Sequence, residues 1–151
     1  MVAAEKGLIS IVQRLVEQGA EKEKVRIDGA TALICAAAMG HLEVVQYFFR
    51  HDTNKHHLNT NGRNAVHLAA QNGHVEVLRY LVQMGLDIDA PDRYGQTPLL
   101  TAAGCGHLPV VKFLVQQGAD MEKTSDCGAT PLKAALAGGR SAVADYLRQA
   151  K

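Results

Sequence analysis

The sequence repeats itself every 33 residues, and this period constrains the fold more than any other feature. Several ladders of identical residues keep the same step independently of one another. The ladders are Gly29, Gly62, Gly95 and Gly128; Gly40, Gly73, Gly106 and Gly139, which Gly7 extends backwards; His41, His74 and His107; and Ala36, Ala69, Ala102 and Ala135. We therefore expect a row of similar modules rather than a single central core.

Each unit reads as two short helices and a long turn. In the most regular unit, Thr97 is a predicted helix cap and Pro98 a first helical position. Gly106 ends that helix, an apolar second helix follows over 110–115, and Gly118 ends it. Neither helix reaches the roughly 12–15 residues at which an isolated helix is marginal in water. Each unit must therefore bury its apolar faces against its neighbours.

Small and aromatic residues indicate how the units pack. The alanine ladder predicts a close approach of first helices, and the second helices are expected to fill their core with Tyr47, Tyr80, Phe113 and Tyr146. The histidine ladder puts equivalent side chains at equivalent positions, whereas catalysis needs dissimilar groups that converge on one point. We therefore interpret these histidines as hydrogen-bonding links between units.

The repeat resembles the ankyrin repeat along essentially the whole chain. The family pattern G-x-T-P-L-H-x-A-A-x-x-G-H is best kept between Gly95 and His107, and most of it recurs from Gly29 and from Gly62. The resemblance implies an all-α fold, a solenoid of stacked helix–turn–helix units with hairpin-like turns. It divides the single domain 1–151 into a partial unit 1–26, units 27–59, 60–92 and 93–125, and a C-terminal cap 126–151.

Departures from the family pattern fall at definite places. Only His67 keeps the family's histidine of the first helix, which implies looser or more apolar junctions where Ile34, Leu100 and Lys133 replace it. Asp52 stands where other units have glycine, so the linker 51–61 is expected to be the least regular. The last unit carries polar outer residues typical of a cap, namely Arg140, Asp145, Arg148 and Lys151. The partial first unit is compatible with excision from a longer protein.

The resemblance also implies that the chain binds another protein through an extended concave surface of turn tips and first helices. Positions on this surface that differ from unit to unit are the informative ones. The predicted contacts are Met39, Thr60, Asn61, Arg63, Gln71, Asn72, Arg93, Tyr94, Gln96 and Cys105. Arg63, Arg93, Tyr94 and Met39 have the strongest claim, because arginine and tyrosine are frequent hot spots and methionine adapts to irregular apolar surfaces.

Composition disfavours other partners. Lys plus Arg number 16 and Asp plus Glu 15, a formal charge of +1 that suits neither nucleic acid nor an anionic membrane. No apolar run reaches the roughly 18 residues of a membrane span. Glu5 and Lys6 interrupt the only short apolar run at the N-terminus, and the three cysteines form no CxxC pair. We expect an intracellular protein, cytoplasmic or nuclear, that is monomeric in isolation.

No chemical motif fits its context. Gly104-Cys105-Gly106 resembles the start of a dinucleotide-binding loop, but the next glycine is missing and Pro109 intrudes. His51, His56 and His57 cluster in a linker, where solvated histidines are commoner than metal ligands. We expect no enzyme active site, cofactor or metal here. Two alternatives stay open: a regulatory fragment of a larger enzyme or multidomain protein, and an engineered binder, although the differences between units favour a natural origin.

Overall fold

The computed structural model describes residues 1–51 and 53–150, and within them the chain forms ten α-helices and no strand. Two residues singled out in the sequence lie outside the described residues. They are Asp52, which stands where other units have glycine, and Lys151, a polar residue of the expected cap. Each first helix is followed by a second helix, and the five pairs are α1 (Val2–Glu5) with α2 (Ile9–Glu17), α3 (Ala32–Ala38) with α4 (Leu42–Arg50), α5 (Ala65–Gln71) with α6 (Val75–Gln83), α7 (Pro98–Cys105) with α8 (Leu108–Gln116), and α9 (Pro131–Ala137) with α10 (Ser141–Gln149).

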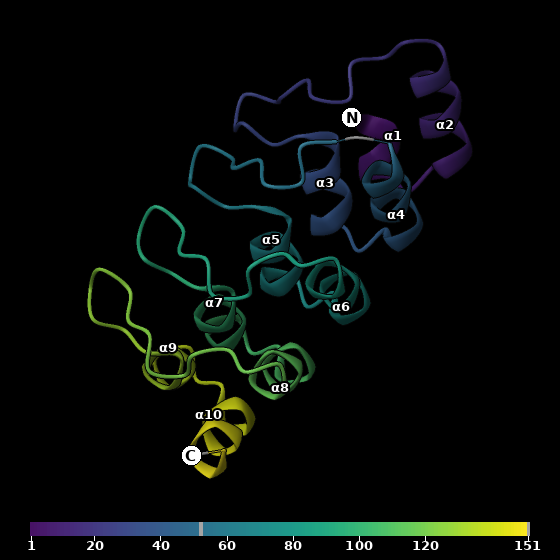
Figure 1. Ribbon diagram of the computed structural model, residues 1–151. Coiled ribbons are helices and arrows are strands. Elements are labelled where there is room, and N and C mark those ends of the chain that lie inside the picture. The colour runs from purple at the N-terminus through teal and green to yellow at the C-terminus, as the bar shows by residue number, and fades with distance from the viewer. Residues whose placement is uncertain (52, 151) are drawn as a thin grey trace.

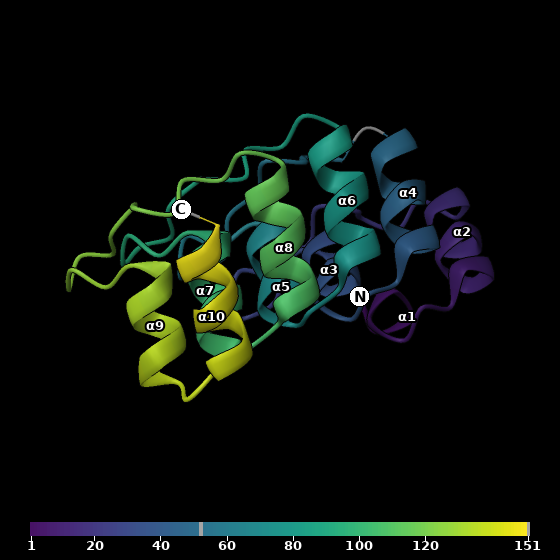
Figure 2. The same cartoon turned by 90° about the horizontal axis from the view of Figure 1, so that it is seen from below.

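The pairs stack in chain order, which confirms the predicted all-α solenoid. In Figure 1 the first helices form one row, the second helices form a parallel row, and long loops project beyond the first helices. Figure 2 shows α4, α6 and α8 side by side in front of α3, α5 and α7. No helix in the described ranges combines the length and the apolar character needed to cross a membrane.

Polar caps explain why the first helices begin where they do. The hydroxyls of Thr31, Thr97 and Thr130 accept hydrogen bonds from the backbone N–H three residues later, at 3.2–3.4 Å. Asn64 takes the same place before α5 and accepts from two backbone N–H groups. Pro98 follows Thr97 without losing a helical hydrogen bond, because a first-turn N–H has no partner within the helix. The predicted helix start at Thr97 is thus confirmed.

The core runs the length of the stack between the two rows. All four residues of the alanine ladder are completely buried, which lets adjacent first helices pack closely. The expectation for the aromatic series is only partly right: Phe113 is buried, but Tyr47, Tyr80 and Tyr146 are half-buried. The reason is their place in the outer row, where Tyr80 meets Phe49 of the preceding second helix edge to face, with ring centroids 5.4 Å apart.

The histidine ladder links each helix pair to the one before it, as the sequence predicts. The Nε2–H groups of His41, His74 and His107 donate to backbone carbonyls 36 residues earlier, at 2.8–2.9 Å. At the last junction Arg140 replaces histidine, and its Nε donates to the Gly104 carbonyl at 3.2 Å. Each histidine ring lies directly against a glycine of the preceding pair. A side-chain hydrogen bond of this kind thus joins each helix pair to the next.

Enlarging the alanine ladder tests this packing. We expect Ala102→Leu to lower the free energy of unfolding by about 1–3 kcal/mol, because the added carbons overfill the space between α7 and its neighbouring first helices. Urea titration followed by circular dichroism measures the change. Ala142→Leu on the exposed side of α10 is the control and should change stability by less than about 0.5 kcal/mol. Equal effects of the two substitutions would contradict the stacking.

A pair of glycines tests the histidine link. Gly40 and Gly85 have similar positive φ values, +77° and +84°, so alanine is strained at both by about 1–2 kcal/mol. A Cβ at Gly40 would also lie 2.5 Å from Nδ1 of His74, whereas one at Gly85 would meet nothing within 4 Å. We expect Gly40→Ala to lower the melting temperature clearly more than Gly85→Ala. Indistinguishable melting curves for the two variants would show that the ring does not hold this junction.

Candidate functional site

The loop tips, residues 26–29, 59–62, 92–95 and 125–128, are joined to one another by backbone hydrogen bonds. One bond of 2.9–3.0 Å connects each tip to the next, and the three are Thr60 N–H to the Asp28 carbonyl, Arg93 N–H to that of Asn61, and Asp126 N–H to that of Tyr94. The tips therefore form a continuous ribbon. We call this ribbon, with the exposed sides of the first helices, the turn-and-first-helix surface.

Short polar side chains hold the inside of each tip. The Asp92 Oδ1 accepts two hydrogen bonds, from the backbone N–H groups of Tyr94 and Gln96, at 2.9 Å each. Asn59 serves the preceding tip in the same way. These acceptors close the turn so that its backbone groups are satisfied internally. The side chains that point away from the turn are then carried on a fixed backbone.

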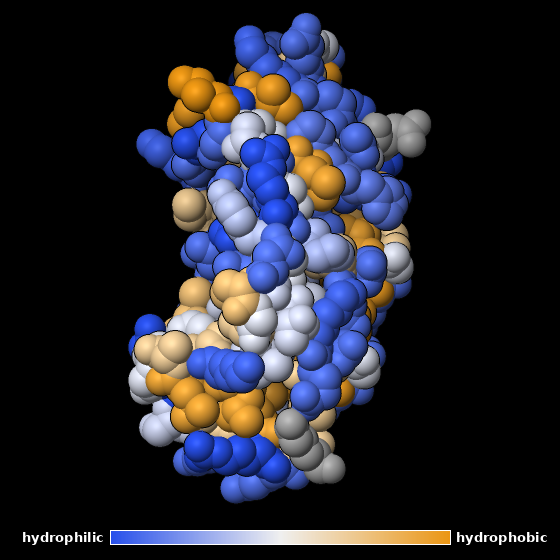
Figure 3. Space-filling model, turned by 90° about the vertical axis from the view of Figure 1, so that its left-hand side faces the viewer, coloured by the Kyte–Doolittle hydropathy of each residue, from blue (hydrophilic) through white to orange (hydrophobic). Residues whose placement is uncertain are grey.

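The predicted contacts fall into two groups on this surface. Thr60, Asn61, Arg93 and Tyr94 lie on the tips and are exposed, with 52% of Tyr94 accessible. The others lie at or near first helices; Met39, Asn72 and Cys105 there are exposed, and Arg63, Gln71 and Gln96 are half-buried. Figure 3 views this side, with hydrophilic residues over much of its middle and apolar ones toward its two ends. The exposed apolar residues Ile27 and Leu58, outside the predicted set, also lie on or beside the tips.

The Arg63 guanidinium forms hydrogen bonds with three side chains, those of Asp92, Gln71 and Gln96. Its Nε donates to Asp92 Oδ2 at 2.8 Å, its Nη1 to Gln71 Oε1 at 3.0 Å, and its Nη2 to Gln96 Oε1 at 3.4 Å. The Asp92 side chain is completely buried and that of Arg63 is 18% accessible. All three guanidinium nitrogens thus have a partner within the chain, and the ion pair joins the third tip to the second.

Asp92, which is not among the predicted contacts, holds this part of the surface together. Burial alone would raise its pKa, but the hydrogen bond from Arg63 and those from the Tyr94 and Gln96 backbone outweigh burial and hold the pKa of Asp92 below its usual value. A signal was present in the sequence, because Asn59, Asp92 and Ser125 form another ladder with the 33-residue step. Their short acceptor side chains indicate a polar turn closure.

His67 lies behind this cluster and is fully buried. Its Nδ1 accepts from the Asn64 backbone N–H at 3.4 Å, which completes a capping box at the start of α5. Its Nε2 is buried without a hydrogen-bond partner among the described residues. Burial lowers the pKa of His67 despite the nearby Asp92 carboxylate, so the ring is neutral at physiological pH. Besides closing its own helix start, the His67 ring lies near the backbone of Ala90 and Gln96 in the next turn, which agrees with the tie between neighbouring turns that the resemblance implies.

The cysteines are all free and differ in their surroundings. Cys35 is buried at a packing position, as expected, and burial raises its pKa. Cys105 and Cys127 are exposed. The Ser125 hydroxyl, 3.2 Å from the Cys127 sulfur, lowers the pKa of that thiol by a hydrogen bond. Among the residues that the structure describes, no histidine or carboxylate is hydrogen-bonded to a cysteine sulfur.

The linker histidines have separate partners. His51 bonds to the Tyr47 carbonyl at 2.8 Å and stacks on the Tyr47 ring, with centroids 4.0 Å apart. His57 bonds to the Gly29 carbonyl at 2.8 Å, an additional link to the preceding tip. In the described ranges, no three His, Cys, Asp or Glu side chains come together as a metal site would need.

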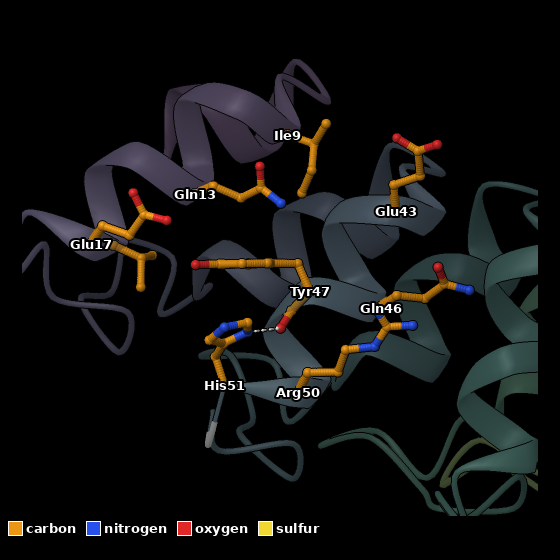
Figure 4. Close-up of a pocket in the computed structure, with 9 residues that line it drawn as sticks. Ile9, Gln13, Glu17, Glu43, Gln46, Tyr47, Arg50 and His51 are labelled. Atoms are coloured by element: carbon orange, nitrogen blue, oxygen red, sulfur yellow. Dashed lines mark hydrogen bonds between the residues drawn. The ribbon is translucent and has the colours of Figure 1, made fainter.

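An open groove lies on the other side of the molecule, between α2 and α4. Figure 4 shows Tyr47 lying across it, with Glu17 and Glu43 at opposite ends. The full lining is Ile9, Gln13, Val16, Glu17, Glu43, Gln46, Tyr47, Arg50 and His51. Because its carboxylates lie apart rather than converging on one point, the groove lacks the geometry of an acid–base site.

Comparison with known proteins identifies the repeat. A family model described as ankyrin repeats, in three copies, matches residues 1–92 and 87–151 of this chain. The two matches together span the sequence from end to end. None of the curated proteins matches the chain significantly.

Removing the Asp92 charge tests the buried ion pair. We expect Asp92→Asn to lower the free energy of unfolding by about 3 kcal/mol at neutral pH, because Arg63 loses its charged partner. Asp145→Asn removes an exposed pair with Arg148 and should cost at most about 1 kcal/mol. Chemical denaturation of the two variants measures both changes, and equal losses would refute a special role for Asp92.

The same variant has a defined pH dependence. Since the pKa of Asp92 is lowered on folding, its contribution is complete above the ordinary aspartate pKa, about 3.9, and is lost as the pH falls through the lower folded value. The stability gap between the wild type and Asp92→Asn should therefore be constant from neutral pH to about pH 5 and close only in stronger acid. A gap that already changes between pH 7 and pH 6 would contradict this assignment, because an aspartate with a lowered pKa does not titrate there.

Proposed function

Because the chain belongs to the ankyrin repeat family, we propose that it binds another protein through its turn-and-first-helix surface, as an adaptor, inhibitor or targeting segment. Ankyrin repeats are generally protein–protein interaction modules and are typically not catalytic. The proposed contacts are Met39, Thr60, Asn61, Arg63, Gln71, Asn72, Arg93, Tyr94, Gln96 and Cys105. The formal charge of +1 supports a protein rather than a nucleic acid as the partner.

One observation carries this proposal: apart from the tip glycines, the residues that repeat are buried or bonded between units, while residues that differ from unit to unit are exposed along the tips. The alanine ladder is buried and the histidine ladder is hydrogen-bonded, so neither is free to contact a partner. We further propose that the units divide at 26/27, 59/60, 92/93 and 125/126, since each division falls within a tip. A monomeric, intracellular chain is part of the same proposal.

Arg93 and Tyr94 are the strongest candidates for the energetic centre. The backbone of their tip is held by bonds to Asn61 before it and Asp126 after it, so these side chains are presented on a fixed support. The Arg93 guanidinium has no ion-pair partner among the described residues. Little ordering of the backbone is therefore needed when a partner binds, and preorganisation of this kind raises affinity.

We expect Arg93→Ala combined with Tyr94→Ala to weaken partner binding by about 2 kcal/mol or more, because arginine and tyrosine are frequent hot spots. Stability should change little, since both side chains are exposed. Proteins captured from cell extract on the immobilised wild-type chain are identified, and the affinity of the purified partner is then measured for each variant.

The matched control is Gln83→Ala with Met84→Ala, an adjacent exposed pair at the end of α6. Its affinity for the partner should equal that of the wild type. Loss of binding in the control but not in the tip variant would transfer the interaction to the row of second helices and overturn the proposal.

A further inference from the structure

Two glutamine side chains on the turn-and-first-helix surface are oriented by Arg63. A guanidinium only donates hydrogen bonds, so the amide oxygens of Gln71 and Gln96 must face it. The two oxygens bind Nη1 and Nη2 of one guanidinium, so both amides flank the same side chain. Their NH₂ groups point away from Arg63, and neither has a hydrogen-bond partner among the described residues. Neither nitrogen is among the buried unpaired side-chain atoms of the described residues, so both NH₂ groups are donors open to solvent.

The backbone of both glutamines is also fixed. The Gln71 carbonyl accepts the inter-unit bond from His107 at 2.8 Å. The Gln96 N–H donates to Asp92 and its carbonyl accepts from the Asp92 N–H, both at 2.9 Å. The two donors thus come from neighbouring units, but both are held by hydrogen bonds to Arg63 and by bonds to their own backbone. A ligand that uses both would lose little free energy to ordering them.

The hydrogen-bonding groups at the pair favour an anionic ligand, and the buried acid beside it does not oppose one. The Asp92 carboxylate is completely buried and occupied by Arg63 and two backbone N–H groups, so its charge is not presented to a partner. Arg93 places an exposed cation on the same tip. Asp126 on the next tip is an exposed carboxylate that lies close to Gly95, and it opposes the Arg93 charge. The ligand is therefore selected by the outward donors rather than by the net charge of the surface.

We propose that Gln71 and Gln96 form a carboxylate-binding site that reads an aspartate or glutamate side chain in an extended acidic segment of the partner. A carboxylate has two acceptor oxygens and no donor, so it fits a site of two outward NH₂ groups, and hydrogen bonds to a charged group are among the strongest. This inference rests on the proposed function, since it names what the same surface recognises.

Titration with a short peptide of alternating glutamate and glycine tests the site. The full chain is labelled with ¹⁵N, and the side-chain amide signals of Gln71 and Gln96 are followed at physiological ionic strength. We expect both signals to shift with the glutamate peptide and not with the same peptide carrying glutamine in place of glutamate. Equal responses to the two peptides would overturn the inference.

The decisive variant is Gln71→Glu with Gln96→Glu. Each substitution keeps an oxygen acceptor for Arg63 but replaces the NH₂ donors with negative charge, so folding should survive and unfolding measurements confirm it. Binding of the glutamate peptide should fall at least about tenfold. The control, Gln83→Glu with Gln116→Glu, makes the same change at exposed ends of α6 and α8 and should have an effect of less than about twofold, because salt screens distant charges.

The outcome separates this inference from the proposed function. Unchanged peptide affinity in the Gln71→Glu, Gln96→Glu variant would refute a carboxylate site at this pair. The proposed function would then still stand if capture of a protein partner depends on Arg93 and Tyr94. Loss of peptide binding in both the variant and its control would also refute the site, because the response would reflect overall charge.

Discussion

The whole structure depends on joining helices that are too short to be stable alone. None of the described helices exceeds nine residues, below the roughly 12–15 at which an isolated helix is marginal. Stability must therefore come from contact between neighbouring pairs. The fully buried alanines bring first helices together, and a histidine pressed against a glycine donates to a carbonyl of the preceding pair at each of three junctions. Arg140 provides the corresponding bond at the fourth.

Residues that hold the stack together are largely different from residues that are free to contact a partner. Apart from the glycines that shape each tip, the residues that recur every 33 positions are used in packing and in inter-unit bonds, so the residues that differ are left exposed on the tips. Arg63 does both. Its guanidinium pairs with Asp92 of the next tip, and it orients the amides of Gln71 and Gln96 so that their NH₂ groups point outward. A substitution there would alter the support of the surface as well as its chemistry.

The sequence predicts the helix pairs, the caps and the histidine links because each depends on a short local pattern repeated at one period. Thr97 with Pro98 marks a helix start without reference to the rest of the chain. The aromatic series was harder, since the same ladder contains a buried Phe113 and half-buried tyrosines whose exposure depends on the neighbouring second helix. The Arg63 cluster could not be derived, because it joins residues 8, 29 and 33 positions apart through side-chain directions that periodicity does not specify.

Hydrogen–deuterium exchange of the chain, alone and with a bound protein partner, tests most directly whether recognition lies on the turn-and-first-helix surface. The account predicts that binding slows exchange at the tips 59–62 and 92–95 and at the ends of α5 and α7, with α4, α6 and α8 unchanged. Protection confined to α4, α6 and α8, with the tips exchanging as they do in the free chain, would contradict it.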